Sequence, residues 1–122
     1  MTKVVFYRSG GVYYGFEEQG HTGYGESGDD MLCNALSAMT MLIYNTIELS
    51  YSSDVEYEID DGATRIVVTS RAALPEFESD ERKRFAISGL FMGYFYQLND
   101  LLEEYSDYLD VEVIDREYNT AH

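Results

Sequence analysis

The chain has 122 residues, 45% of them hydrophobic and 12 of them tyrosine, which is enough apolar material for one folded domain spanning 1–122. Its 8 basic and 23 acidic residues give a formal net charge of −15, which argues against nucleic acid as a partner because phosphate binding needs a basic surface. No stretch approaches the roughly eighteen apolar residues of a membrane span, so no membrane association is expected.

The cysteine and histidine content limits the available chemistry. Cys33 is the only cysteine and cannot form an internal disulfide, which is typical of a reducing cytoplasm. The opening residues turn polar too soon for a secretory signal, so a cytoplasmic location is expected. His21 and the terminal His122 are the only histidines, too few for a zinc site of Cys and His ligands. We therefore expect no metal and no cofactor.

The first half of the chain predicts a hairpin, a loop and a helix. Residues 3–8 and 12–20 are predicted strands joined by a tight glycine turn. Residues 20–29 contain four glycines and form a predicted loop. A helix is expected from Met31 to about Ile47, capped by Asp30. Its apolar residues surround nearly the whole circumference, which predicts a centrally buried helix.

The second half predicts another hairpin, a long helix and a last strand. "DVEYEID" and "TRIVVTS" flank Asp61-Gly62, the strongest hairpin signal in the chain. The second helix is expected from near Ser79 to about Leu109, about 45 Å long. Its apolar seam, with 4-3-4-3-4 spacing, consists of Ile87, Phe91, Tyr94, Leu98, Leu101 and Tyr105. With a strand at 111–114, the order is β-β-α-β-β-α-β, an α+β domain with a largely antiparallel sheet and two helices.

Gly89 and Gly93 lie four residues apart in the second predicted helix. Such a pair permits close approach, either by a second subunit or by the first helix of the same chain. We favour a close crossing with the first helix.

His21 and Cys33 are candidates for thiol catalysis. With Met31 as the first helical residue, Cys33 falls in the first turn, where unpaired N–H groups and the positive end of the helix dipole stabilise a thiolate. The same N–H groups would hold a developing oxyanion. His21 is the only internal histidine, and the glycine loop between the two residues is long enough to bring its imidazole to the sulfur as general base and acid.

Each of these residues also has a non-catalytic interpretation. A lone cysteine in an apolar helix is usually a small buried hydrophobe, and a histidine in a glycine loop is usually a solvated turn residue. Asp30 either caps the helix alone or also tunes His21. Ser37 and Thr40 follow Cys33 by one and two turns; they either touch substrate or bond back to their own helix, and back-bonding is favoured for Thr40.

The stretch from Gly20 to Ala38 resembles the signature of the ribosomal-processing cysteine protease family, often called Prp. The matching parts are Gly20-His21-Thr22, the glycine-rich 23–28, Asp30-Met31-Leu32-Cys33 and the small helical continuation 34–38. Chain length, the opening strand, the acidic middle hairpin and the long last helix are similar to that family as well. Two departures are Thr22, where alanine is common, and Asn34, where a small residue is usual. Neither removes a catalytic group.

The resemblance implies an endopeptidase with a cysteine/histidine dyad, in which His21 is the general base and acid and Cys33 is the nucleophile. Asp30 and Ser37 would be supporting residues. The implied substrate is the short N-terminal extension of ribosomal protein twenty-seven of the large subunit, removed during ribosome assembly by cleavage after an aromatic residue. The family forms homodimers with a mobile loop over the site, here represented by Gly20, Thr22, Gly23, Gly25 and Gly28.

The acidic charge is consistent with this assignment, because ribosomal proteins are strongly basic and would be steered toward an acidic enzyme. The same charge also simply favours solubility. A non-catalytic acidic binding or assembly factor for a basic ribosomal protein is the alternative, and it would not require the pair His21 and Cys33. Another thiol chemistry, such as acyl transfer, would use the same two residues.

Overall fold

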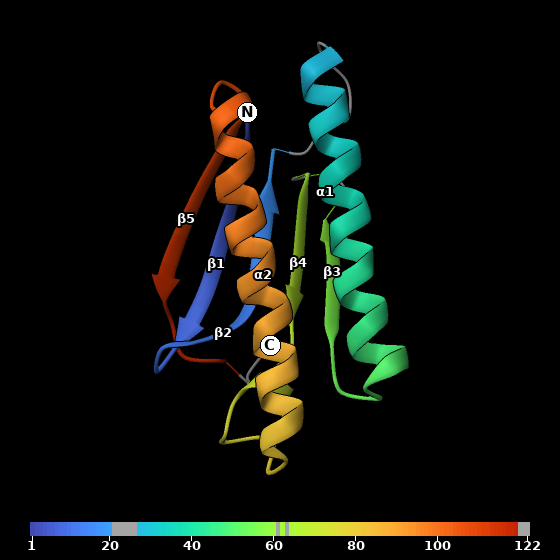
Figure 1. Cartoon of the computed structure of the whole chain (residues 1–122), viewed down its shortest axis with the longest axis vertical. Coiled ribbons are helices and arrows are strands. Elements are labelled where there is room, and N and C mark those ends of the chain that lie inside the picture. The colour runs from blue at the N-terminus through green and yellow to red at the C-terminus, as the bar shows by residue number, and fades with distance from the viewer. Residues whose placement is uncertain (21–26, 61, 63, 120–122) are drawn as a thin grey trace.

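A computed structural model of the chain describes residues 1–20, 27–60, 62 and 64–119, with the backbone alone at 27–30. In this part of the chain one five-stranded sheet carries two long helices on one face (Figure 1). The elements are β1 (Thr2–Ser9), β2 (Val12–Gln19), α1 (Ser27–Asn45), η1 (Thr46–Ser50), β3 (Glu56–Asp60), β4 (Arg65–Thr69), η2 (Arg71–Ala73), α2 (Glu81–Tyr105) and β5 (Leu109–Asp115). The predicted α+β class and element order are confirmed.

The strand order across the sheet is β3-β4-β2-β1-β5. Both predicted hairpins are present, with Ser9 opposite Val12 and Asp60 opposite Arg65. The pair of β1 and β5 is parallel and the other pairs are antiparallel, so the sheet is largely antiparallel, as predicted. The central strand β2 is therefore hydrogen-bonded on both sides. In the part of the chain that the structure describes, no helix has the length and apolar character that a membrane crossing requires.

The core lies between the sheet and the helices. Aromatic side chains dominate it, and the rings of Phe16 on β2 and Tyr94 on α2 meet edge to face at 4.9 Å. The predicted seam of α2 faces the core: Ile87, Phe91, Tyr94 and Leu98 are buried, and Leu101 and Tyr105 are partly buried against it. The seam therefore attaches α2 along the middle of the sheet.

Helix α2 is shorter than predicted. Its first residue follows Asp80, whose carboxylate accepts a hydrogen bond from the amide of Arg82 at 2.9 Å. Its 25 residues span about 37 Å. The expected end at Leu109 is wrong because Leu109 opens β5, where it lies opposite Thr2. Apolar periodicity alone does not separate the last helical turn from an apolar strand that follows it closely.

Helix α1 differs from its prediction in start and in burial. It begins at Ser27, four residues before Met31, and continues after Asn45 as the short π-helix η1. The expected central burial is wrong: Met31 and Leu42 are 63% and 62% exposed. Figure 1 shows the reason, since α1 lies over the β3–β4 side of the sheet and only its inner face is covered. Helix α1, whose apolar residues surround nearly its whole circumference, is thus only half buried.

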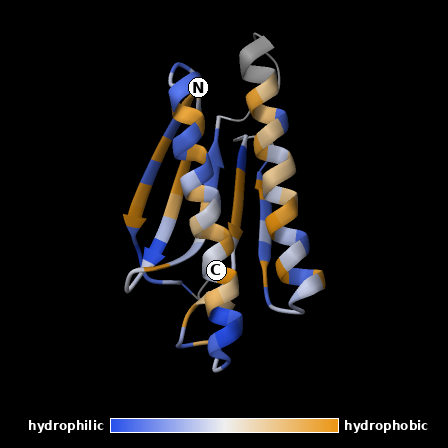
Figure 2. Cartoon of the chain, in the orientation of Figure 1, coloured by the Kyte–Doolittle hydropathy of each residue, from blue (hydrophilic) through white to orange (hydrophobic). Residues whose placement is uncertain are grey.

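The two glycines of α2 border an open groove, so the expected close crossing with α1 is wrong. A Cβ atom placed on Gly89 or Gly93 would have no neighbour within 4 Å. A groove of about 260 Å³ runs between the helices; its lining is Met39, Leu42, Ile43, Gly89, Leu90, Gly93, Tyr94 and Gln97. In Figure 2 the middle turns of α2 are pale or orange, while its first turn is blue. None of the residues that line the groove is charged.

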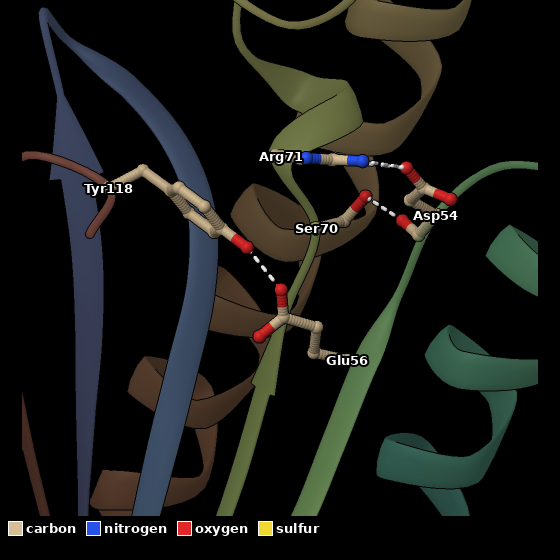
Figure 3. A network of polar contacts seen from close by, with 5 residues as sticks. All are labelled: Asp54, Glu56, Ser70, Arg71 and Tyr118. Carbon is tan, nitrogen blue, oxygen red and sulfur yellow. Dashed lines mark hydrogen bonds and ion pairs between the residues drawn. The ribbon is translucent and has the colours of Figure 1, made fainter. Parts of the chain in front are cut away.

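The C-terminal segment 116–119 lies on the opposite face of the sheet from α2. The ring of Tyr118 packs edge-on against Tyr14 and Phe77, with centroids 5.8 and 5.3 Å apart. Its hydroxyl donates a hydrogen bond to Glu56 on β3 (Figure 3). The segment thus joins the second strand of the chain to the sheet edge.

A second set of contacts fastens the beginning of β3 to the residues after β4. The Arg71 guanidinium pairs with the Asp54 carboxylate at 3.0 Å, and the Ser70 hydroxyl donates to the Asp54 carbonyl (Figure 3). Ser70 is buried, so its hydroxyl finds its partner on the backbone. These contacts hold the hairpin of β3 and β4 against η2.

Candidate active site

Cys33 lies on the inner face of α1. It is 3% exposed, and Leu36, one turn further along, is fully buried beside the sheet. The neighbouring residues Met31 and Asn34 point outward. The inward orientation follows from the apolar stripe of the helix, which packs its most hydrophobic side against the sheet. The thiol therefore points into the layer between α1 and the sheet.

The earlier helix start changes the electrostatic argument for Cys33. Asp30 is the fourth residue of α1, so its expected role as N-cap is wrong. Cys33 is the seventh residue, at the end of the second turn, and not in the first. The unpaired amides and the dipole effect concentrate in the first turn. The helix terminus is therefore not expected to stabilise the thiolate of Cys33. Deprotonation of the thiol then depends mainly on an acid–base partner.

Gly20 directly follows β2 and precedes His21, the predicted histidine, in the sequence. Its φ is +72°, a conformation that L side chains rarely adopt. A Cβ atom there would lie 2.6 Å from the carbonyl oxygen of Met1. Its amide donates to the carbonyl of Thr64 at 3.1 Å. The backbone of Gly20, predicted as a loop residue, is thus held in one conformation next to the end of β2.

The structure describes the other predicted site residues to different extents. His21, Thr22, Gly23 and Gly25 lie outside the described residues. For Gly28 and Asp30, the structure describes only the backbone, within α1. Ser37 lies one turn after Cys33 and is exposed. The pairing of His21 with Cys33 and the supporting roles of Asp30 and Ser37 therefore stay predictions.

A buried carboxyl that the sequence interpretation missed lies close to this layer. Glu18 on β2 is 0% exposed, and its Oε1 accepts hydrogen bonds from Thr40 at 2.8 Å and Tyr94 at 2.6 Å. The expected back-bonding of Thr40 to its own helix is wrong, because its hydroxyl donates to the sheet. The signal was present in the sequence: Glu17 and Glu18 are adjacent in a strand, so one of them must face the core.

Comparison with known proteins identifies the family. The sequence profile described as cysteine protease Prp matches residues 1–110, which include both His21 and Cys33. No curated protein sequence matches the chain.

Solved structures share the fold over nearly the whole chain. The protein SMU.848 from Streptococcus mutans has a TM-score of 0.77 at 22% identity and covers 95% of this chain and 99% of its own. The essential ribosomal processing protease Prp from S. aureus, in complex with a substrate peptide, has a TM-score of 0.71 at 18% identity and covers 95% and 100%. The same protease with a covalently linked product peptide has a TM-score of 0.71 at 19% identity and covers 93% and 100%. Because the family profile spans most of its length, the chain belongs to the cysteine protease Prp family and is a cysteine protease.

Proposed function

We propose that the chain is a cytoplasmic ribosome-processing endopeptidase that removes the short N-terminal extension of large-subunit ribosomal protein twenty-seven. Cys33 is the nucleophile and His21 is the general base and acid. The observation that carries the proposal is the family match over 1–110, which includes both residues of the dyad. The S. aureus relatives, which hold a substrate peptide and a covalently linked product peptide, support a peptide as the substrate class.

The chemistry follows from the two side chains. His21 takes the thiol proton, and the Cys33 sulfur attacks the scissile carbonyl carbon. The imidazolium then gives its proton to the departing amine as the carbon–nitrogen bond breaks, which leaves a thioester on Cys33. Water, deprotonated by His21, attacks the thioester and releases the carboxylate product together with the free thiol. Atoms and protons balance over the cycle, and no cofactor is consumed.

The charge of the chain supports a basic substrate. A net charge of −15 raises the local concentration of a cationic protein and speeds its encounter with the enzyme. The acidic residues of β3 illustrate the surface involved: Glu56, Glu58 and Asp60 are exposed on an edge strand. Ribosomal proteins carry the opposite charge, so the acidic surface and the proposed substrate are complementary.

The test is incubation of the enzyme with the N-terminally extended ribosomal protein, followed by mass spectrometry. We expect one cut near the extension boundary, absent in Cys33→Ala and in His21→Ala. His122→Ala is the matched control for the histidine and should cleave like the wild type. An acidic binding or assembly factor would retain the extended protein without cutting it. Wild-type cleavage rates in Cys33→Ala would remove the nucleophile assignment.

We also propose a homodimer that forms through the uncharged face of the two helices. Residues 31–47 and 85–99 contain no charged side chain, although 25% of the chain is charged. Leu42, which lines the groove, is 62% exposed, and Tyr96 of α2 is 61% exposed. Two copies with a charge of −15 each repel one another except where a surface is neutral. This apolar face is the surface on which a second copy meets the least repulsion.

A further inference from the structure

Glu18 occupies an unusual position for a carboxyl. It belongs to the central strand β2, where its backbone lies between Val4 of β1 and Ile66 of β4. Its neighbour Glu17 points to the other face of the sheet and pairs there with Arg65. Glu18 instead points into the layer between sheet and helices. Burying a carboxyl is unfavourable unless hydrogen bonds compensate for lost water, so its partners are informative.

The partners come from both helices. Thr40 of α1 and Tyr94 of α2, 2% and 4% exposed, donate their hydroxyls to the same oxygen of Glu18. Burial and the neighbouring Glu18 carboxyl raise the pKa of the Tyr94 phenol well above its ordinary value, so Tyr94 stays a protonated donor. These three residues form a buried junction of strand and helices.

The buried junction determines where α1 lies on the sheet. The remaining inner face of α1 is apolar, with Leu36 and Ile43 buried on either side of Thr40. Apolar contacts are non-directional, and a half-exposed helix held by them alone can shift or rotate. A hydrogen bond depends on distance and angle, so the bond from Thr40 to Glu18 fixes one position and one rotation of the helix.

Cys33 shares this constraint with Thr40. The two residues are seven apart, close to two helical turns, so they lie on one face of α1 about 10 Å apart along its axis. A rigid helix passes any shift at Thr40 on to the sulfur. On the sheet side, Glu18 precedes His21 by only three residues, and Gly20 between them is held by its backbone hydrogen bond to Thr64. One hydrogen bond thus connects the two segments that carry the dyad.

We propose that Glu18 is a positioning residue of this peptidase: through its hydrogen bond with Thr40 it holds α1, and with it Cys33, in register with the end of β2. This inference rests on the proposed function. Glu18 does not touch the substrate and transfers no proton. Its effect is on the geometry of the reacting sulfur, where a displacement of about 1 Å costs about 100-fold in rate.

The experiment uses the full chain and four variants. Glu18→Leu removes the acceptor and substitutes an apolar side chain of similar size, which leaves the buried hydroxyls of Thr40 and Tyr94 without this acceptor. Glu18→Gln keeps a carbonyl acceptor for both hydroxyls. Thr40→Val removes the donor of α1 with little change of shape. Thr46→Val is the matched control, because the hydroxyl of Thr46, at the start of η1, donates to the carbonyl of Leu42 four residues earlier at 2.7 Å and not to the sheet.

The readouts are kcat and KM for the extended ribosomal protein and the rate of alkylation of Cys33 by iodoacetamide as a function of pH, with circular dichroism to verify folding. We expect Glu18→Leu and Thr40→Val to lower kcat about 10- to 100-fold, while KM stays within about twofold. In both variants the alkylation rate at neutral pH falls about tenfold, because a displaced thiol loses its acid–base partner. Glu18→Gln and Thr46→Val should resemble the wild type.

Two results overturn the inference. One is wild-type kcat and alkylation in folded Thr40→Val, which remains informative if Glu18→Leu fails to fold. The other is a loss in Glu18→Gln equal to that in Glu18→Leu, which would make the charge of Glu18, and not its hydrogen bonds, responsible. If the wild type cuts no extended ribosomal protein, the proposed function fails. The alkylation comparison between Thr40→Val and Thr46→Val still tests the positioning role without substrate.

Discussion

Tyr7 on β1 donates its phenolic hydroxyl to the carboxylate of Glu17 on β2, on the face of the sheet that is turned away from the helices. The same carboxylate receives the guanidinium of Arg65 from β4 and the amide of Gln19. Three neighbouring strands are thereby joined by one nearly buried carboxylate. A carboxylate with this many donors is strongly favoured in its charged form.

Stability should therefore fall in acid through Glu17. Burial raises the pKa of its carboxyl, but the hydrogen bonds from Arg65, Tyr7 and Gln19 outweigh burial and hold the pKa below the ordinary value of 4.5. The stabilisation is complete above this unfolded value and disappears as the pH falls through the lowered folded value. At neutral pH, Glu17→Gln should lower the free energy of unfolding by about 1–2 kcal/mol.

The measurement is the urea unfolding of wild type and Glu17→Gln as a function of pH. The difference between the two proteins should shrink as the solution is made more acidic. Glu58→Gln, an exposed acid on β3, is the control and should show no such convergence. A difference that stays constant from neutral to acid pH would show that the carboxylate is not the group that titrates.

The segment 116–119 should contribute measurably to stability through Tyr118. Tyr118→Ala removes the ring contacts with Tyr14 and Phe77 and the hydrogen bond to Glu56, and we expect a loss of about 2–3 kcal/mol. Tyr118→Phe keeps the ring and should cost only about 1 kcal/mol. Chemical unfolding measures both values. Equal losses in the two variants would mean that the ring contacts contribute nothing.

Substitution by alanine should have opposite effects on stability at two glycines. At Gly15 on β2, a Cβ atom would lie 2.6 Å from Cγ2 of Thr69 and 2.7 Å from the carbonyl oxygen of Val68. Gly15→Ala should therefore destabilise the protein by about 1–3 kcal/mol. At Gly89 in α2 the space is open, and Gly89→Ala should raise the stability of the monomer by up to about 1 kcal/mol. Thermal unfolding at low protein concentration compares the pair; the same sign for both would contradict the packing described.

The uncharged helix face predicts which substitution should disrupt the proposed dimer. Leu42→Glu places a carboxylate in the groove between α1 and α2, where a second copy would have to bury it. We expect the molar mass measured by analytical ultracentrifugation to halve at micromolar concentration. Leu49→Glu is the matched control, because Leu49 is 72% exposed and lies outside the groove. A monomeric wild type, or equal dissociation by both variants, would rule out this interface.

The sequence alone was sufficient for the elements with strong local signals. Asp61-Gly62 between two alternating segments predicted the hairpin of β3 and β4, and the spacing of Ile87 to Leu98 predicted the buried face of α2. Both signals arise from short-range geometry. The start of α1 was predicted too late because Asp30 is a good cap in isolation, although Ser27 also suits a helix start.

The features that the sequence did not predict depend on contacts between distant parts of the chain. Thr40 was expected to bond to its own helix, the local choice, but the buried carboxyl of Glu18 provides a stronger acceptor on a strand 22 residues earlier. The groove at Gly89 depends on how far apart two helices lie, which no periodicity encodes. Within the candidate site, the family motif indicated Cys33 and His21. Two adjacent acids in a strand imply that one of them faces the core, but that this residue is Glu18, with Thr40 and Tyr94 as its partners, follows only from the folded chain.

Cleavage of a basic substrate should depend strongly on salt. With a net charge of −15 on the enzyme, the association rate with an extended ribosomal protein should fall about tenfold or more as the salt concentration rises from low to physiological. The change should appear in kcat/KM and leave kcat nearly unchanged, since steering acts on encounter and not on the chemical step. The control is a short peptide with the same cleavage site but no net charge. Its kcat/KM should vary little with salt, because without opposite charge on the substrate the acidic surface has nothing to attract. An equal salt response for both substrates would mean that salt acts on the enzyme itself and that the acidic surface serves solubility alone.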